Sequence, residues 1–206
     1  MDSTTMPRQA YSSGILLSSF SIVIVLLIIP PMCWHFRNRN IGATALVAWV
    51  ILMNFQSFVN ALIWPTDDIG TWFSGDGLCD VQIKLQVASQ VALPAAFACV
   101  LRALANVMDT DRTTLGLTKA QRRREYAIDL TWVLVLPMLQ MLFHYIVQTS
   151  RYYIWGVSGC VPSVSASWVT VVLILVPPTV WTFICAYYAS RCSHYEQVQR
   201  PETDRY

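Results

Sequence analysis

Charged residues are scarce in this chain. Asp, Glu, Lys and Arg together make up 13% of its 206 residues, against 55% hydrophobic residues, and the mean hydropathy is +0.45. Soluble domains carry roughly 25% charged residues, which cover their surface with groups that water solvates. The composition therefore excludes an ordinary soluble domain and favours a membrane protein. The formal net charge of +2 is too small to indicate a nucleic-acid partner, and we expect none.

The chain also lacks the residue groupings that metal binding and catalysis need. Among its six cysteines there is no C-x-x-C pair, and none is combined with histidine at the spacing of a zinc site. There is no glycine-rich phosphate loop, no Ser/His/Asp grouping, and no pair of histidines or carboxylates within one apolar segment. We therefore expect no metal site, no cofactor and no enzyme activity.

Long apolar segments are what the chain does have. A helix that crosses a bilayer needs about 20 mostly apolar residues. We predict an all-α integral membrane protein with five spanning helices, at roughly residues 13–34, 41–64, 81–104, 126–146 and 167–188. The first is too long for the core of a signal peptide and is expected to be retained. Residues 1–12 and 189–206 are expected to be polar tails on either side of a helical bundle at 13–188.

Basic residues gather on one side of these segments. The connectors 35–40 and 108–125 and the tail after Tyr188 hold two, five and three Lys or Arg residues, whereas the connector 65–80 holds none and has four aspartates. Because cytoplasmic connectors carry the excess of Lys and Arg, we expect an extracellular N-terminus and a cytoplasmic tail. Arg122, Arg123 and Arg124 are then expected to meet anionic membrane lipid, and a cytosolic partner is the alternative.

The start of the third segment combines a carboxylate with an ammonium group. Asp80 and Lys84 are four residues apart, so on a helix they can pair. Gln82, Gln86 and Ser89 form a stripe on nearly the opposite side. A helix that is polar on two sides is costly to expose to lipid, so we expect it to be central and to line a cavity. In the alternative, Lys84 reaches the lipid headgroups and the glutamines bond to neighbouring helices.

Two cysteines fall on the side expected to be extracellular. Cys79 and Cys160 are the only cysteines there, and an oxidising space favours a disulfide between them. This bond would fold the connector 147–166 over the bundle. Two free thiols are the alternative. Cys192, next to the membrane on the cytoplasmic side, is a candidate for palmitoylation.

Other polar and aromatic residues lie within or beside the segments. Asn60 in the second segment is expected to form helix–helix hydrogen bonds. His144, at the outer end of the fourth, is interpreted as interfacial rather than ligand-binding, and Trp64 as part of an interfacial aromatic belt. Arg102 should lie at the cytoplasmic end of the third segment, where it could pair with Asp109 or meet lipid phosphates.

Prolines interrupt four of the five segments. They are Pro94, Pro137 and the pairs Pro30-Pro31 and Pro177-Pro178. Helix neighbours in a membrane bundle can bond to the carbonyl that a proline frees, so proline is tolerated there and often marks a kink. Irregular packing and a moving hinge both remain open.

Short motifs follow one another in a particular order along the chain. They are Pro31 with Trp34-His35, Arg39-Asn40-Ile41-Gly42, Trp49, Asn54, Phe58-Val59-Asn60-Ala61, Ile63-Trp64, Leu78-Cys79-Asp80, Lys84-Leu85, Pro94-Ala95, Cys99-Val100-Leu101-Arg102 and Gly159-Cys160-Val161-Pro162. In this order, over roughly residues 14–190, they resemble the fungal mating-pheromone receptors for lipidated, a-factor-type peptides, a branch of the class D G-protein-coupled receptors.

The resemblance implies a seven-helix receptor of the plasma membrane. Such a receptor binds a lipidated peptide pheromone and activates the alpha subunit of a heterotrimeric G protein. The positions carried over by resemblance to the ligand side are Asp80 and Lys84. Further candidates for the ligand side are Gln86, Asn60, Trp64 and His144. Those carried over to the G-protein side are Arg102, Arg122, Arg123 and Arg124.

This sequence departs from the pattern in two respects. Only five apolar segments are present, and by the resemblance they correspond to the first five of the seven, so we expect a fragment or a truncated form of the receptor. The outer connector has Gln148-Thr149-Ser150-Arg151 where a Gly-His-Arg-like run is more usual. An alternative is therefore a five-span, non-signalling membrane protein that pairs with a full-length receptor as a homo- or hetero-oligomer. An unrelated small transporter would show internal pseudo-symmetry and charges near the membrane midplane, and the sequence shows neither.

Overall fold

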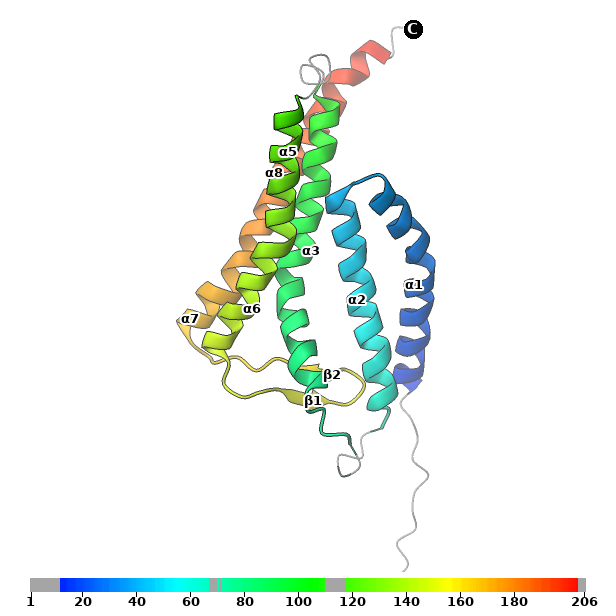
Figure 1. Cartoon of the computed structure of the whole chain (residues 1–206), viewed down its shortest axis with the longest axis vertical. Helices are drawn as coiled ribbons and strands as arrows, with labels where there is room; N and C mark the ends of the chain where they lie inside the picture. The colour runs from blue at the N-terminus through cyan, green and yellow to red at the C-terminus, as the bar shows by residue number, and fades with distance from the viewer. Residues whose placement is uncertain (1–11, 67–69, 71, 110–117, 204–206) are drawn as a thin grey trace, which may run out of the picture.

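Helices make up almost all of the structure. A computed structural model describes residues 12–66, 70, 72–109 and 118–203, without the side chains beyond residue 197 (Figure 1). The elements in chain order are α1 (Ser12–Arg37), α2 (Ile41–Ile63), α3 (Leu78–Met108), α5 (Lys119–Leu130), η2 (Thr131–Val135), α6 (Leu136–Val147), β1 (Tyr153–Trp155), β2 (Gly159–Val161), α7 (Trp168–Thr170), η3 (Val171–Leu175) and α8 (Val176–Thr203). The predicted all-α fold class is confirmed.

Five helices are long and apolar enough to cross a membrane. They run over Ser12–Arg37, Ile41–Ile63, Leu78–Met108, Lys119–Val147 and Trp168–Gln197, so the fourth combines α5, η2 and α6, and the fifth combines α7, η3 and most of α8. All five predicted segments are confirmed as helices. The predicted N-terminal tail at 1–12 lies outside the described residues except for Ser12, and the orientation of the bundle stays a prediction.

Several helix ends lie beyond the predicted bounds. The fourth spanning helix begins at Lys119 rather than at 126, because Thr118 and Gln121 form a capping box there. Residues 189–203 of the predicted cytoplasmic tail are helical and continue α8, and their cytoplasmic location stays a prediction. Polar residues continue these helices past the apolar segments, and hydropathy does not detect such extensions.

The third spanning helix, α3, is the central one. It contacts α2, α6 and α8 and has buried residues along most of its length, whereas α1 packs on α2 (Figure 1). Ala92, Ala95 and Ala96 are fully buried, and small side chains such as these let neighbouring helices approach closely. At Gly42 in α2 an added Cβ would lie only 2.7 Å from Cβ of Cys99 in α3. The two polar sides of α3 thus correctly predicted its central place.

Two of the proline sites coincide with π-helical segments. The segment η2 lies just before Pro137, and η3 lies just before Pro177 and Pro178. A proline has no N–H to donate to the carbonyl four residues earlier. For Pro178 this carbonyl belongs to Ile174, and it accepts a hydrogen bond from Nε2 of the buried Gln140 in α6, at 3.3 Å. Pro30, Pro31 and Pro94 lie inside α1 and α3 without such segments.

A hairpin connects the fourth and fifth spanning helices. Strands β1 and β2 pair antiparallel, and the hairpin passes across the end of α3 to reach α2 (Figure 1). We call this end of the bundle, marked by Cys79 and Cys160, the disulfide end. The opposite end, where the first turns of α5 carry Arg122, Arg123 and Arg124, is called the basic end.

Candidate functional site

Cys79 and Cys160 form a disulfide that joins the start of α3 to β2. Their Cα atoms are 5.3 Å apart, and both residues are fully buried. The prediction of this disulfide is confirmed. It closes a long loop, with 81 residues of sequence separation, and holds the hairpin against the bundle. Gly75 lies directly beside the bond with φ +74°, and any side chain there would overlap Sγ of Cys79.

Asp80 pairs with the connector just before β1 rather than with its own helix. Its Oδ2 lies 2.6 Å from a guanidinium nitrogen of Arg151, and Asp76 lies 3.7 Å from the same guanidinium. The predicted pairing of Asp80 with Lys84 is wrong. A guanidinium matches a carboxylate better than an ammonium does, and Lys84 has acceptors in another direction.

Lys84 points toward α6. Its Nζ lies 2.9 Å from Nδ1 of His144 and 3.0 Å from Oε1 of Gln148. Because an ammonium group only donates, Nδ1 of His144 accepts, and the imidazole proton is on Nε2. The ring of Tyr145 lies 5.6 Å from the same ammonium. His144 is completely buried, so its interpretation as an interfacial residue is wrong. The contact ties α3 to the end of α6, which no lipid-facing histidine could do.

Three more of the predicted ligand-side residues contact the connectors at this end. Nδ2 of Asn60 donates to the carbonyl of Ser158 at 2.9 Å, so its predicted helix–helix bond is replaced by one to the hairpin. Gln86 donates to the carbonyl of Cys160 at 2.9 Å. Trp64 is fully buried beside the disulfide, and its indole N–H donates to the carbonyl of Phe73. Its assignment to an interfacial belt is wrong, because the connectors cover it.

The exposed rim of the disulfide end is a charged network. The hydroxyl of Tyr152 donates to Asp76 at 2.9 Å, and hydrogen bonds from Tyr152 and Ser74 hold the pKa of the Asp76 carboxyl below its ordinary value. The carboxylate of Asp80 raises the pKa of the Arg151 guanidinium. Lost solvation, and then the bond to Asp76, raise the pKa of the Tyr152 phenol. At neutral pH the Asp76 carboxylate and the Arg151 guanidinium of this rim therefore stay charged.

At the basic end, Arg102 pairs with Asp129. The two side chains are 2.6 Å apart and only 12% and 18% exposed, and the guanidinium lies 5.2 Å from the ring of Trp132. The predicted pairing of Arg102 with Asp109 is wrong, because Arg102 has Asp129 as its partner and Asp109 caps the end of α3. There it accepts from Tyr195 at 3.2 Å and lies 3.8 Å from Arg191.

The remaining predicted residues of the basic end differ in exposure. The side chains of Arg122, Arg123 and Arg124 are exposed on the first turns of α5. Cys192 is half-buried, and its thiol points to the carbonyl of Leu101 in α3 at 3.7 Å. Its palmitoylation stays a prediction.

Comparison with known proteins relates the chain to one family. Residues 16–204 match the family profile described as the pheromone A receptor (STE3). The chain belongs to the pheromone A receptor family. It is 33% identical to the pheromone a factor receptor of Saccharomyces cerevisiae over 88% of this chain and 38% of that protein. It is 28% identical to pheromone receptor 1 of Mycosarcoma maydis, over 88% of this chain and 49% of that protein. No solved structure matches the chain.

Membership of the pheromone A receptor family, together with the five apolar helices, makes this a multi-pass membrane protein. The family is one of receptors and not of enzymes. The chain spans about 38–49% of the length of the relatives named above. The predicted resemblance is therefore confirmed over most of this chain but over less than half of these relatives.

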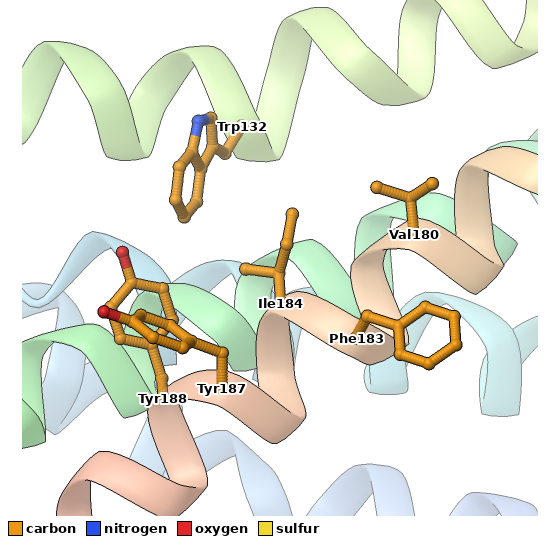
Figure 2. A pocket seen from close by; sticks show the side chains of 6 residues that line it. All are labelled: Trp132, Val180, Phe183, Ile184, Tyr187 and Tyr188. Carbon is orange, nitrogen blue, oxygen red and sulfur yellow. The ribbon is translucent and has the colours of Figure 1, made fainter.

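This member of the pheromone A receptor family also has an apolar groove of about 470 Å³ between the fourth and fifth spanning helices. Figure 2 shows Trp132 pointing from the fourth helix toward the side chains of α8. The residues that line the groove are Trp132, Val180, Phe183, Ile184, Tyr187 and Tyr188. Because Trp132 also contacts Arg102, the groove lies toward the basic end, away from the predicted ligand-side residues.

Four residues that form contacts described above are not among the predicted site residues. Arg151 and Gln148 hold the connector to α3, Asp129 neutralises Arg102, and Gln140 bonds to Ile174. Arg151 is the one basic residue of its connector and lies opposite a connector with four aspartates, so charge complementarity could have indicated it. Gln140 is a lone amide in an apolar segment, which is itself a signal of a bond between helices.

Proposed function

We propose that this chain forms the five-helix portion of a G-protein-coupled receptor for a lipidated peptide pheromone in the plasma membrane. The observation that carries the proposal is the match to the pheromone A receptor family over residues 16–204. The named relatives are pheromone receptors, which supports the same function for this chain.

The two ends of the bundle suit different partners. The disulfide end has Asp80, Lys84 and Gln86 around a fixed hairpin, with Asn60, Trp64 and His144 beneath or beside it. We propose that this end faces outward and contacts the pheromone. The basic end has three exposed arginines next to a buried Arg102–Asp129 pair. We propose that it faces the cytoplasm and meets anionic lipid and the G-protein alpha subunit.

A chimera tests the receptor function. The part of the Saccharomyces cerevisiae a factor receptor that matches this chain is replaced by it, in cells that lack their own receptor. The response to a panel of farnesylated peptides, a factor among them, is compared with the response to the same peptides without the lipid. We expect at least one farnesylated peptide to be active and its non-lipidated form to be much weaker. A chimera that reaches the cell surface and shows no such preference would contradict the proposal.

The alternative five-span protein makes a different prediction. If the chain acts by pairing with a full-length receptor, expressing it alone beside that receptor changes the receptor's response. The receptor proposal gains support if co-expression has no effect and the chimera responds.

A further inference from the structure

Three buried amide side chains lie in the contact between α2 and α3, beneath the hairpin. Gln56 and Asn60 are one turn apart on α2 and are 7% and 1% exposed, and Gln82 on α3 is 5% exposed. Nε2 of Gln56 lies 3.5 Å from the backbone carbonyl of Gln82, and Asn60 donates to Ser158 of the hairpin. The three residues thus share one contact region, bounded above by β2.

Each of these amides has a side-chain oxygen without a partner. Oε1 of Gln56, Oδ1 of Asn60 and Oε1 of Gln82 are buried and accept no hydrogen bond among the described residues. Exchanging the amide oxygen and nitrogen does not remove the problem. In Asn60 and Gln56 the nitrogen already faces a backbone carbonyl, and an exchange would place oxygen against oxygen.

The donors nearest to this region are already used. The amide of Gln86 donates to the carbonyl of Cys160, and the indole of Trp64 donates to that of Phe73. The ammonium group of Lys84 points away, toward His144 and Gln148. Whatever satisfies the three oxygens therefore has to bring its own N–H or O–H groups.

Water has the required chemistry and a metal ion does not. Three neutral amide oxygens are present without a carboxylate, since Asp80, the nearest acidic residue on α3, is bonded to Arg151. Buried water typically makes about three hydrogen bonds to polar groups that lack other partners. We propose that Gln56, Asn60 and Gln82 form an internal hydration site that holds ordered water between α2 and α3.

With water at this site, the contacts of α3 with α8 and with α2 differ in chemistry. Toward α8 the contact is apolar, with Val91, Ala95, Ala98 and Trp181 packed together. Toward α2, beneath the hairpin, it is a contact through water, whose hydrogen bonds can be exchanged without opening the apolar core. This inference depends on neither the orientation of the bundle nor the receptor function.

Radiolytic labelling in ¹⁸O-water tests the proposal directly. An X-ray pulse produces hydroxyl radicals from bound water, which label the side chains beside it, in the purified chain in lipid nanodiscs. Trp64 lies one helical turn after Asn60, Ile83 directly follows Gln82, and the two are 0% and 1% exposed. Trp181 and Ile174 are 7% and 5% exposed and lie in apolar contacts. We expect Trp64 and Ile83 to be labelled at least threefold faster than their matched residues. Equal or slower labelling would overturn the proposal.

A double variant tests whether the three amides are responsible. Gln56→Met with Gln82→Met removes two of the acceptors and keeps side chains of similar length. Labelling of Trp64 and Ile83 should then fall to the rates of Trp181 and Ile174. The matched control is Gln140→Met, which removes a buried amide from the α6–η3 contact. It should leave the labelling rates of Trp64 and Ile83 unchanged. If the double variant forms its disulfide and Trp64 and Ile83 are still labelled at the original rates, the proposal is overturned. If the variant does not fold, the comparison of Trp64 and Ile83 with Trp181 and Ile174 in the unsubstituted chain remains the test.

Discussion

Asp80 of α3 is bonded to Arg151, which lies just before β1 and 71 residues further along the chain, and not to Lys84 one helical turn away. Because Asp80 and Lys84 have different partners, the start of α3 contacts two separate segments of the chain. Asp80 binds the connector before β1 through Arg151, and Lys84 binds the end of α6 through His144 and Gln148. The start of α3 is thus fixed to its surroundings by a disulfide, an ion pair and an ammonium contact.

The Asp80–Arg151 pair should contribute little to stability. The two side chains are 39% and 67% exposed, and water and salt screen ion pairs that are this exposed. Asp80→Arg and Arg151→Asp should each lower the melting temperature of the purified chain slightly. The double exchange should recover part of the loss, but not all of it, because a carboxylate at position 151 would face Asp76. A loss in the double variant equal to the sum of the single losses would contradict a direct pairing. Added salt should reduce each effect, since the pair is exposed.

Lys84 is expected to matter for signalling more than for folding. In the receptor chimera, Lys84→Met removes the donor to His144 and Gln148 and should weaken the pheromone response at unchanged surface expression. The control is Val81→Ala, an exposed position on the same helix, which should leave the response unchanged. If Lys84→Met responds like the unsubstituted chimera at equal expression, its placement on the ligand side is wrong.

The membrane helices were predictable because the length of an apolar run decides whether it spans. The disulfide followed from the positive-inside rule, which left two cysteines together on one side. Contacts between residues far apart in sequence were not predictable in the same way. Lys84 and His144 are 60 residues apart, and only the path of the hairpin shows that Trp64 is covered rather than at the lipid interface. Helix ends were missed where a cap, such as Thr118, continues a helix into polar sequence.

Gly159 should tolerate no side chain, for a reason that Gly77 does not share. Both have positive φ, at +73° and +77°, but an added Cβ at Gly159 overlaps the side chain of Asn60, whereas at Gly77 nothing lies within 4 Å. Gly159→Ala should therefore lower the melting temperature and the yield of the Cys79–Cys160 disulfide. Asn60→Ala added to Gly159→Ala should recover part of the loss in melting temperature. Added to Gly77→Ala, it should recover none. The same recovery at both sites would show that backbone strain alone is responsible.

Removing one partner of the Arg102–Asp129 pair should strongly lower the free energy of unfolding. Asp129→Ala leaves a guanidinium that is only 12% exposed without its carboxylate, and a buried charge without a partner costs up to about 3–5 kcal/mol. Asp109→Ala at the more open pair with Arg191 should cost about 1 kcal/mol or less. Thermal unfolding of the two variants in the same detergent makes the comparison, and equal losses would contradict the burial argument.

The bond between Gln140 and Ile174 should depend on Pro178. The proline cannot donate to the carbonyl of Ile174, and Gln140 does so across the helix contact at 3.3 Å. Gln140→Leu should therefore cost about 1–2 kcal/mol in the otherwise unchanged chain. Pro178→Ala supplies a backbone N–H to the same carbonyl, so the double variant should lose less than Gln140→Leu alone. Thermal unfolding of the four proteins gives the coupling energy, and strictly additive losses would show that the amide and the proline act independently.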